Sequence, residues 1–477
     1  MTDTGLEPIH GRAPLRAPGP ARAPQARACT TAAEATAAGL LLVFIVAMMF
    51  PINLHLGELR LTPVRIVLLL AVVPMAVRLA AGRAGPITAV DWFMAGHAAW
   101  IWISLMTNHG LPRLPYAGVT ALELFGGYLI GRTLIRSAFD YRLMFRYLLW
   151  ALLACGPFVL VEFLTDRQYL QEIFRPFLDV FTKPDSSYGR LGFHRVMAGF
   201  EHPILFGLFC SMAVANVFYL YRHAPFWRWA LLAYVGFLTF TSLSSAPLLS
   251  LALQLGLIAW GHISNARWRM LALGLILAYV TVDLLSNRTP VTLVIHYLTF
   301  SPGTGWTRIH IWNYGIEEVW RHPLFGIGLN DWARPFWLTY SVDNFWLLTA
   351  MRYGIPGFVF LAAAIGLTLY RVSTANGLDA EARAIRLGYL ITMVGLFVTL
   401  ATVHIWGAVS VFVMAYIGAG NWMTEQNGNR ETVPRRQRPR HRNASGPAVR
   451  EDVPNEVQSR PKSARRAVTR TTREQDE

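Results

Sequence analysis

The stretch 341–357, SVDNFWLLTAMRYGIPG, combines a membrane-spanning pattern with residues that a simple membrane anchor does not need. It lies at the start of an apolar run, 344–370, which is longer than the ~20 residues that cross a bilayer as a helix. Asp343 precedes the run, and Arg352 and the sequence GIPG interrupt it. The stretch therefore predicts a transmembrane helix that is kinked or closely packed and that carries polar chemistry at one end.

The rest of the chain has the same apolar character. Of its 477 residues, 54% are hydrophobic and 15% are charged, against about 25% charged residues in soluble proteins. Because a bilayer forces each span to satisfy its own backbone hydrogen bonds, we predict an all-α polytopic membrane protein with about 12 transmembrane helices. The predicted spans are 38–54, 63–81, 87–106, 114–131, 144–164, 202–221, 229–243, 246–263, 268–285, 344–370, 387–403 and 405–420.

The arginines indicate the orientation of these spans. If the N-terminus is cytoplasmic, every short inner loop carries arginine and the short outer loops carry few, as the positive-inside rule requires. Two longer loops, 165–201 and 286–343, then face outward. Both contain amphipathic pieces rich in aromatic residues, such as 308–320, which predict short interfacial helices.

We expect one transmembrane domain, 37–425, between two disordered cytoplasmic tails, 1–36 and 426–477. The C-terminal tail holds 13 Arg and Lys against 7 Asp and Glu, a net charge of 13 − 7 = +6, within a chain of formal charge +15. Such a tail favours anionic lipid headgroups. Nucleic-acid binding is the alternative, but the tail has almost no aromatic residues to stack on bases, so we expect no nucleic-acid partner.

Neither the cysteines nor the first apolar run indicates further processing or a metal site. Cys29, Cys155 and Cys210 show no disulfide framework or metal-ligand spacing, and no Asp-x-Asp motif occurs in the chain. We therefore expect no metal requirement and no cofactor. The first run follows arginines, as a signal peptide does, but no small-x-small cleavage site follows, so we expect an uncleaved span.

Three outward-facing features occur in a fixed order along the chain. The first, FHRVMAGFEHPILFG (193–207), places Arg195 just before a span. The second, GWTRIHIWNYGIEEVWRHPLFGIGLNDW (305–332), contains Arg308 and a turn. The residues of that turn are His322, Pro323, Gly326 and Gly328. The third is the stretch 341–357.

These features resemble the O-antigen ligase/polymerase superfamily over roughly residues 190–360. Its members are multi-span enzymes of the bacterial cytoplasmic (inner) membrane that move sugars from a polyprenyl-pyrophosphate carrier at the periplasmic face. In its ligases, a His followed by Asn, Ser or Gln stands nine residues before Gly-x-x-Gly. Here Asn344 has that spacing to Gly354-Ile355-Pro356-Gly357, and Asp343 occupies the His position. The resemblance therefore implies the polymerase branch.

The chemistry of such a transfer suits these residue types. The pyrophosphate leaving group develops negative charge, which arginine holds with bidentate contacts, so Arg195 and Arg308 are candidate catalytic residues. A partly desolvated carboxylate can act as general base, and Asp343 is the candidate. The predicted substrate-binding set is Arg195, Arg308, His322, Asn344 and Arg352. The predicted structural motif is Gly354, Pro356 and Gly357 with Pro323, Gly326 and Gly328.

Each assignment has a structural alternative. Arg195 and Arg308 can extend to lipid headgroups, and Asp343 can cap the following helix instead of, or besides, taking a proton. Arg352 lies within a span, where a charge is paired or functional. We expect its partner to be Asp343 or Glu123, a second charged residue within a predicted span.

The resemblance implies polymerisation of lipid-linked oligosaccharide repeat units into a surface polysaccharide or exopolysaccharide. The expected partners are that lipid-linked oligosaccharide, membrane lipids, and the chain-length regulator and flippase of the same pathway. Two alternatives remain. The protein can be a ligase that passes finished glycan to a lipid or protein acceptor, or a transporter of the lipid-linked sugar, although a transporter predicts polar residues at the bilayer midplane.

Overall fold

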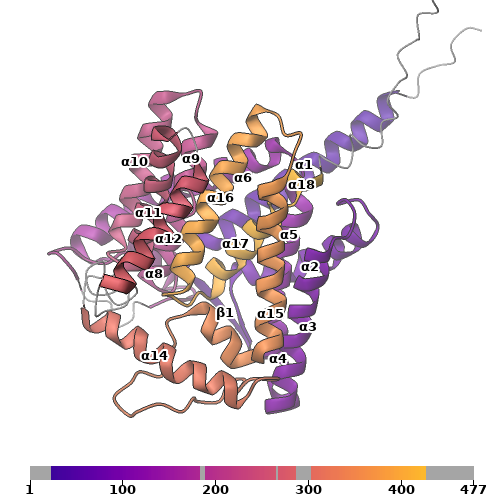
Figure 1. Ribbon diagram of the computed structural model, residues 1–477. Coiled ribbons are helices and arrows are strands. Elements are labelled where there is room, and N and C mark those ends of the chain that lie inside the picture. The colour runs from indigo at the N-terminus through magenta and orange to yellow at the C-terminus, as the bar shows by residue number, and fades with distance from the viewer. Residues whose placement is uncertain (1–22, 58, 183–188, 265–266, 286–301, 426–477) are drawn as a thin grey trace, which may run out of the picture. The chain divides into compact units, whose positions relative to one another are not determined.

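The computed structural model describes residues 23–425 except 58, 183–188, 265–266 and 286–301. The described chain is mostly helical (Figure 1). Its first helices are α1 (Ala23–Met49), α2 (Pro63–Ala80), α3 (Ala89–His109), α4 (Leu114–Ala121), α5 (Gly127–Leu134), α6 (Ala138–Thr165) and α7 (Tyr169–Phe174). They are followed by α8 (Pro203–Ser211), α9 (Val214–Leu220), α10 (Pro225–Thr241), α11 (Ser245–Ile263), α12 (Trp268–Leu285), α14 (Pro302–Arg321), α15 (Phe345–Thr374), α16 (Ala380–Leu400), α17 (Gly407–Gly418) and α18 (Trp422–Glu425).

Most predicted spans fall on one helix or on consecutive short ones, but the span 38–54 runs past the end of α1 at Met49 into the strand β1 (Ile52–Leu56). The segment 114–131 consists of α4, a π-helical turn η2 (Leu122–Gly126) and α5, with a 3-10 turn η1 (Leu111–Arg113) before them. Residues 23–36, assigned to the N-terminal tail in the prediction, form the first turns of α1. The remaining tail residues, 1–22 and 426–477, lie outside the described residues.

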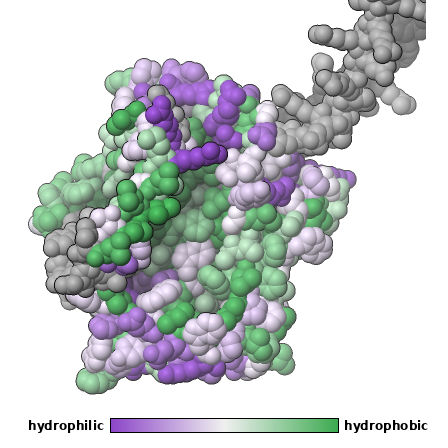
Figure 2. Space-filling view, in the orientation of Figure 1, coloured by the Kyte–Doolittle hydropathy of each residue, from purple (hydrophilic) through white to green (hydrophobic). Residues whose placement is uncertain are grey.

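Six described helices are long and apolar enough to cross a membrane. They are Pro63–Ala80, Ala138–Thr165, Pro203–Leu220, Ser245–Ile263, Phe345–Thr374 and Ala380–Leu400. Figure 2 shows hydrophobic residues over the middle of the visible face, while hydrophilic residues gather at its upper and lower ends. This distribution is the one expected of a membrane bundle. A total of twelve crossings stays a prediction.

A small antiparallel sheet departs from the all-α prediction. β1 (Ile52–Leu56) pairs with β2 (Leu59–Leu61) and with β3 (Asp179–Val180), in the order β2-β1-β3. His55 Nε2 lies 3.0 Å from Asp179 Oδ2 across the sheet. Strands this short leave no alternating pattern in the sequence, so their pairing depends on how α1 and the loop after α6 meet. The sheet ties that loop to the α1–α2 turn.

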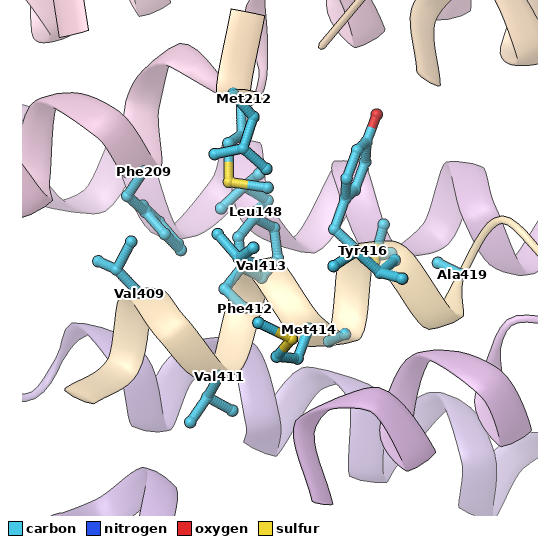
Figure 3. Packing of buried hydrophobic residues seen from close by; sticks show 14 of the residues in the cluster. Leu148, Phe209, Met212, Val409, Val411, Phe412, Val413, Met414, Tyr416 and Ala419 are labelled. Carbon is cyan, nitrogen blue, oxygen red and sulfur yellow. The ribbon is translucent and has the colours of Figure 1, made fainter. Parts of the chain in front are cut away.

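The core lies around α17, whose residues are almost all buried (Figure 3). Two glycines on α5 let the two backbones meet, since a Cβ on Gly131 would lie 1.8 Å from the carbonyl oxygen of Ala415. A Cβ on Gly127 would lie 2.6 Å from the carbonyl oxygen of Val411. Glycines four residues apart are the usual means of close helix packing in membranes.

A buried polar network joins the helices around α17. Asn216 of α9 accepts a hydrogen bond from the hydroxyl of Tyr141 at 2.6 Å. Its amide nitrogen donates to the hydroxyl of Tyr416 at 2.9 Å and to Thr392 at 3.0 Å. These contacts connect α9 to α6, α17 and α16. A satisfied network of this kind fixes helix orientation, because an unpaired polar group in an apolar core is costly.

Candidate functional site

Three arginines come together at the end of the bundle that carries α14: Arg190, Arg195 and Arg308. Arg190 and Arg195 lie in the segment before α8, and Arg308 lies on α14. Arg190 is close enough to the other two that its charge lowers the pKa of both guanidinium groups. The two predicted arginines therefore share a neighbour that sequence reasoning did not single out.

Arg195 is buried and held by hydroxyl and carbonyl groups. Its Nε donates to the carbonyl oxygen of Ser242 at 3.2 Å, and its Nη2 donates to Ser244 Oγ at 2.8 Å. Burial, reinforced by Arg190, lowers the pKa of Arg195 to about 10. The side chain stays protonated at neutral pH, yet it forms no ion pair with any residue that the structure describes. It thus holds a positive charge inside the protein.

Arg308 also lacks a charge partner at ion-pair distance in the described chain. Its Nε is buried without a hydrogen-bond partner among those residues. Burial lowers the pKa of Arg308, while the carboxylate of Asp343 raises it and Arg190 lowers it further. The opposing effect of Asp343 places this carboxylate near Arg308. Two predicted catalytic residues from separate elements are therefore neighbours.

Asp343 and Asn344 have different structural roles. Asn344 is the N-cap of α15, and its Oδ1 accepts a hydrogen bond from the backbone N–H of Leu347 at 3.0 Å. Asp343 accepts a hydrogen bond from Ser341 Oγ at 3.1 Å and is half-buried. The alternative that Asp343 caps the helix is therefore wrong, because the cap is one residue later. The carboxylate stays outside the helix terminus.

Helix α15 is broken at Gly354, which has φ 71°. Pro356 has no N–H to donate to the carbonyl of Arg352, so the break leaves that carbonyl without its helical partner. The backbone N–H of Gly328 takes that place and donates to Arg352 O at 3.0 Å. A Cβ on Gly354 would lie 2.0 Å from Leu324 O. The opening stretch and the turn at 323–328 thus dock on each other through their backbones.

The remaining glycines and proline of the predicted structural motif lie in the same contact. Pro323 O accepts a hydrogen bond from Ile355 N at 2.8 Å. Gly326 has φ 63°, and a Cβ there would lie 2.4 Å from Met351 O. A Cβ on Gly357 would lie 3.2 Å from the Trp100 ring on α3. These small residues therefore allow α3, α15 and the turn at 323–328 to pack closely.

His322 contacts a carboxylate of the preceding helical turn. Its Nε2 lies 3.4 Å from Glu318 Oε1, one turn earlier, and about half of its side chain is exposed. Arg321 makes similar contacts to Glu317 and Glu318. The structure gives His322 a local partner on α14 and does not bring it to Asp343. Its assignment to substrate binding stays a prediction.

Arg352 does not have the partner that we expected. Its Nη1 donates to the hydroxyl of Tyr116 at 3.5 Å, and it forms no ion pair within the described chain. Glu123 pairs instead with Arg65 of α2, at 2.7 Å. Glu123 lies on the π-helical turn η2, which packs against α2. The carboxylate therefore meets a residue from a helix that sequence spacing did not indicate.

Two open pockets meet at Arg352. Both are lined by Leu348, Arg352 and His404. The first also contacts Tyr116, Glu123, Tyr353, Trp406 and Ser410. The second also contacts Asn330, Asp331, Trp332, Tyr340 and Ser341. We call the two together the joined pocket.

Sequence reasoning missed the loop between α16 and α17. His404 stacks against Phe345 and Trp406, with ring centroids 6.2 and 5.8 Å away. Burial and, to a smaller extent, the charge of Arg352 together lower the pKa of His404 to about 3, so the imidazole is neutral at pH 7. The signal was present as VHIWG, a polar interruption of residues 403–407 between two apolar runs.

The described residues contain no group of three or more His, Cys, Asp or Glu side chains that could hold a metal ion. Cys155 and Cys210 are buried and free. The groups around Arg308 and the joined pocket include arginines, the half-buried carboxylate of Asp343, the neutral imidazole of His404 and aromatic rings.

Residues 230–362 match the sequence model of a family described as O-Antigen ligase. The match includes Arg308, Asp343, Arg352 and the break in α15. Two of the three sequence features, 305–332 and 341–357, lie in the matched segment, and the match supports their resemblance to this superfamily. Arg195 and His404 lie outside the matched segment. No curated protein matches the chain.

Proposed function

We propose, from the match of residues 230–362 to the O-Antigen ligase family, that the protein is a membrane glycosyltransferase of the O-antigen ligase/polymerase superfamily and polymerises polyprenyl-pyrophosphate-linked oligosaccharide repeat units. The product is a surface polysaccharide or exopolysaccharide made at the periplasmic face of the cytoplasmic membrane. The observation that carries the proposal is the arginine cluster, Arg190, Arg195 and Arg308, beside Asp343. Arg195 and Arg308 form no ion pair within the described chain, and positive charge of this kind is suited to an anionic substrate.

The reaction exchanges one bond to the anomeric carbon for another. A hydroxyl of the acceptor sugar attacks C1 of the donor sugar, and the bond from C1 to the pyrophosphate oxygen breaks. The electron pair leaves with the polyprenyl pyrophosphate, whose added charge the arginines stabilise. The proton of the attacking hydroxyl passes to Asp343, which stands beside Arg308. The transfer needs neither an oxidant nor a nucleotide.

Replacing Arg308 tests this proposal directly. Purified protein in detergent is incubated with a synthetic polyprenyl-pyrophosphate oligosaccharide, and the products are separated by chain length. We expect R308A to lower the rate of elongation about 10²–10³-fold, as the loss of one charge-stabilising donor does in other enzymes. R308K should recover part of the rate, because it restores the charge without the bidentate fork.

Arg321→Ala is the matched control. Arg321 lies on the same helix, is about half exposed, and contacts Glu317 and Glu318. We expect R321A to elongate normally. Equal rates for R308A and R321A, or a wild-type protein that forms no longer chains, would refute the polymerase.

The ligase alternative is favoured by one observation, the description of the matched family as O-Antigen ligase. A deletion strain separates the two activities. Loss of a polymerase leaves single repeat units on the carrier and on the cell surface, whereas loss of a ligase leaves long chains on the carrier. A transporter of the lipid-linked sugar is excluded if the purified protein elongates glycan in detergent, where no compartments exist.

A further inference from the structure

Arg352, which forms no ion pair with any residue that the structure describes, lines both parts of the joined pocket. It lies in the predicted span 344–370, immediately before the break in α15, and its hydrogen bond to Tyr116 is long, at 3.5 Å. A charged side chain in a membrane helix is usually paired or belongs to a substrate pathway. At the break, the Arg352 backbone contacts the turn at 323–328. The backbone N–H of Gly328 in that turn donates a hydrogen bond to the carbonyl oxygen of Arg352.

The acids on the pocket wall are already neutralised by other arginines. Glu123 pairs with Arg65 at 2.7 Å. Asp331 pairs with Arg334 at 2.5 Å, and that contact lowers the pKa of Asp331. Neither carboxylate is therefore available to Arg352. The positive charge of Arg352 is therefore not neutralised by either carboxylate.

The rest of the wall suits a sugar. Trp406 and Tyr340 provide ring faces, and Tyr116, Ser341 and Ser410 provide hydroxyl groups. Sugar rings are bound by such combinations, because their axial C–H groups are apolar and their hydroxyl groups need hydrogen-bond partners. His404 is neutral, so it contributes a polar ring without a second positive charge.

The charge of the pocket distinguishes it from the arginine cluster. Three guanidinium groups, those of Arg190, Arg195 and Arg308, match the charge of a pyrophosphate. Arg352 offers a single guanidinium, which matches one carboxylate in a bidentate pair. Val342 lines the joined pocket directly before Asp343, so a sugar there lies next to the residue that we assign as general base.

We propose that the joined pocket binds an acidic sugar of the acceptor glycan, with Arg352 paired to the sugar carboxylate. This inference rests on the proposed function, since it assigns the substrate class of the acceptor. Arg352 then determines specificity, because a neutral sugar in the same place would leave its charge unpaired.

Isothermal titration calorimetry of the full-length protein in detergent tests the proposal without any transfer reaction. The probes are short oligomers of glucuronate, galacturonate and mannuronate, their neutral hexose counterparts, and inorganic pyrophosphate. We expect at least one uronate oligomer to bind about tenfold or more tightly than its neutral counterpart. R352Q should abolish that preference, and R352K should keep part of it.

Two controls isolate the effect. R371Q removes an arginine from the far end of the same helix and should retain the preference. Pyrophosphate should lose affinity in R308A but not in R352Q. The size-exclusion profile of each variant reports whether it is folded, and R352K provides a conservative replacement if R352Q does not fold.

The inference is overturned if no uronate oligomer is preferred, or if the preference survives undiminished in R352Q. It is also overturned if R352Q weakens pyrophosphate instead of the uronates, since Arg352 then belongs to the donor site. Failure of the proposed function has a different signature. The wild-type protein would bind a uronate oligomer with dependence on Arg352 but would not elongate lipid-linked glycan.

Discussion

At the scale of single residues, the adjacent Asp343 and Asn344 have different roles: Asn344 caps α15, and Asp343 does not. Asn344 caps α15 through its Oδ1, at 3.0 Å from Leu347 N. Asp343 keeps its carboxylate outside the helix terminus and near Arg308. In sequence either residue is a suitable cap, because both side chains favour that position. The backbone path into the helix decides which one is used, and it leaves the carboxylate for chemistry.

This division predicts opposite effects for two substitutions. N344A should destabilise the protein by about 1 kcal/mol through loss of the cap, while N344D should retain most of the stability. D343N should leave the melting temperature close to that of the wild type and should strongly reduce elongation, because an amide does not accept the proton. Thermal unfolding in detergent and the chain-length assay measure the two effects. A melting temperature lowered more by D343N than by N344A would contradict the assignment.

At the scale of elements, the break in α15 is produced by its own sequence and stabilised by another segment. Pro356 removes a helical donor, and Gly354 adopts φ 71°, which side chains rarely allow. The turn at 323–328 then supplies backbone N–H groups to the freed carbonyls. Two distant glycine- and proline-rich motifs are thus halves of one contact, and this contact sets the position of Arg352.

We expect G354A to destabilise the protein by more than about 2 kcal/mol, because a Cβ would meet Leu324 O and the positive φ is strained for alanine. The matched control is G366A on the same helix, where a Cβ would meet nothing within 4 Å. That change should be neutral or slightly stabilising, since alanine favours helix more than glycine does. Equal melting temperatures for the two variants would show that the break is not required.

At the scale of the whole described bundle, α17 is the centre on which other helices pack. Its contact with α5 needs glycine at position 131 because two backbones touch there. The buried network of Asn216 adds directional hydrogen bonds to this apolar packing. A short helix can therefore hold the bundle together although it does not itself have the length of a membrane span.

Enlarging that contact should damage the whole bundle. G131A places a Cβ 1.8 Å from Ala415 O, a clash with backbone that cannot be relieved by a side-chain rotation, so we expect a loss of about 2–3 kcal/mol or failure to fold. G236A on α10 is the control, because its Cβ would meet nothing within 4 Å. Melting temperature and yield of monodisperse protein measure the difference. A G131A protein as stable as G236A would contradict the central role of α17.

Local sequence patterns are enough to locate most of the helices and to supply the residue types of the candidate site. A hydrophobic run is a local property, so most of the predicted spans fall on helices, and a break at GIPG follows from the chemistry of proline and glycine. Only the tertiary structure decided the partnerships: Arg65 with Glu123, Arg190 beside Arg195 and Arg308, and His404 at the joined pocket. Arg65 and Glu123 lie 58 residues apart, and Arg308 lies 113 residues beyond Arg195. The packing of the helices brings such distant charges together, and no local sequence pattern encodes it.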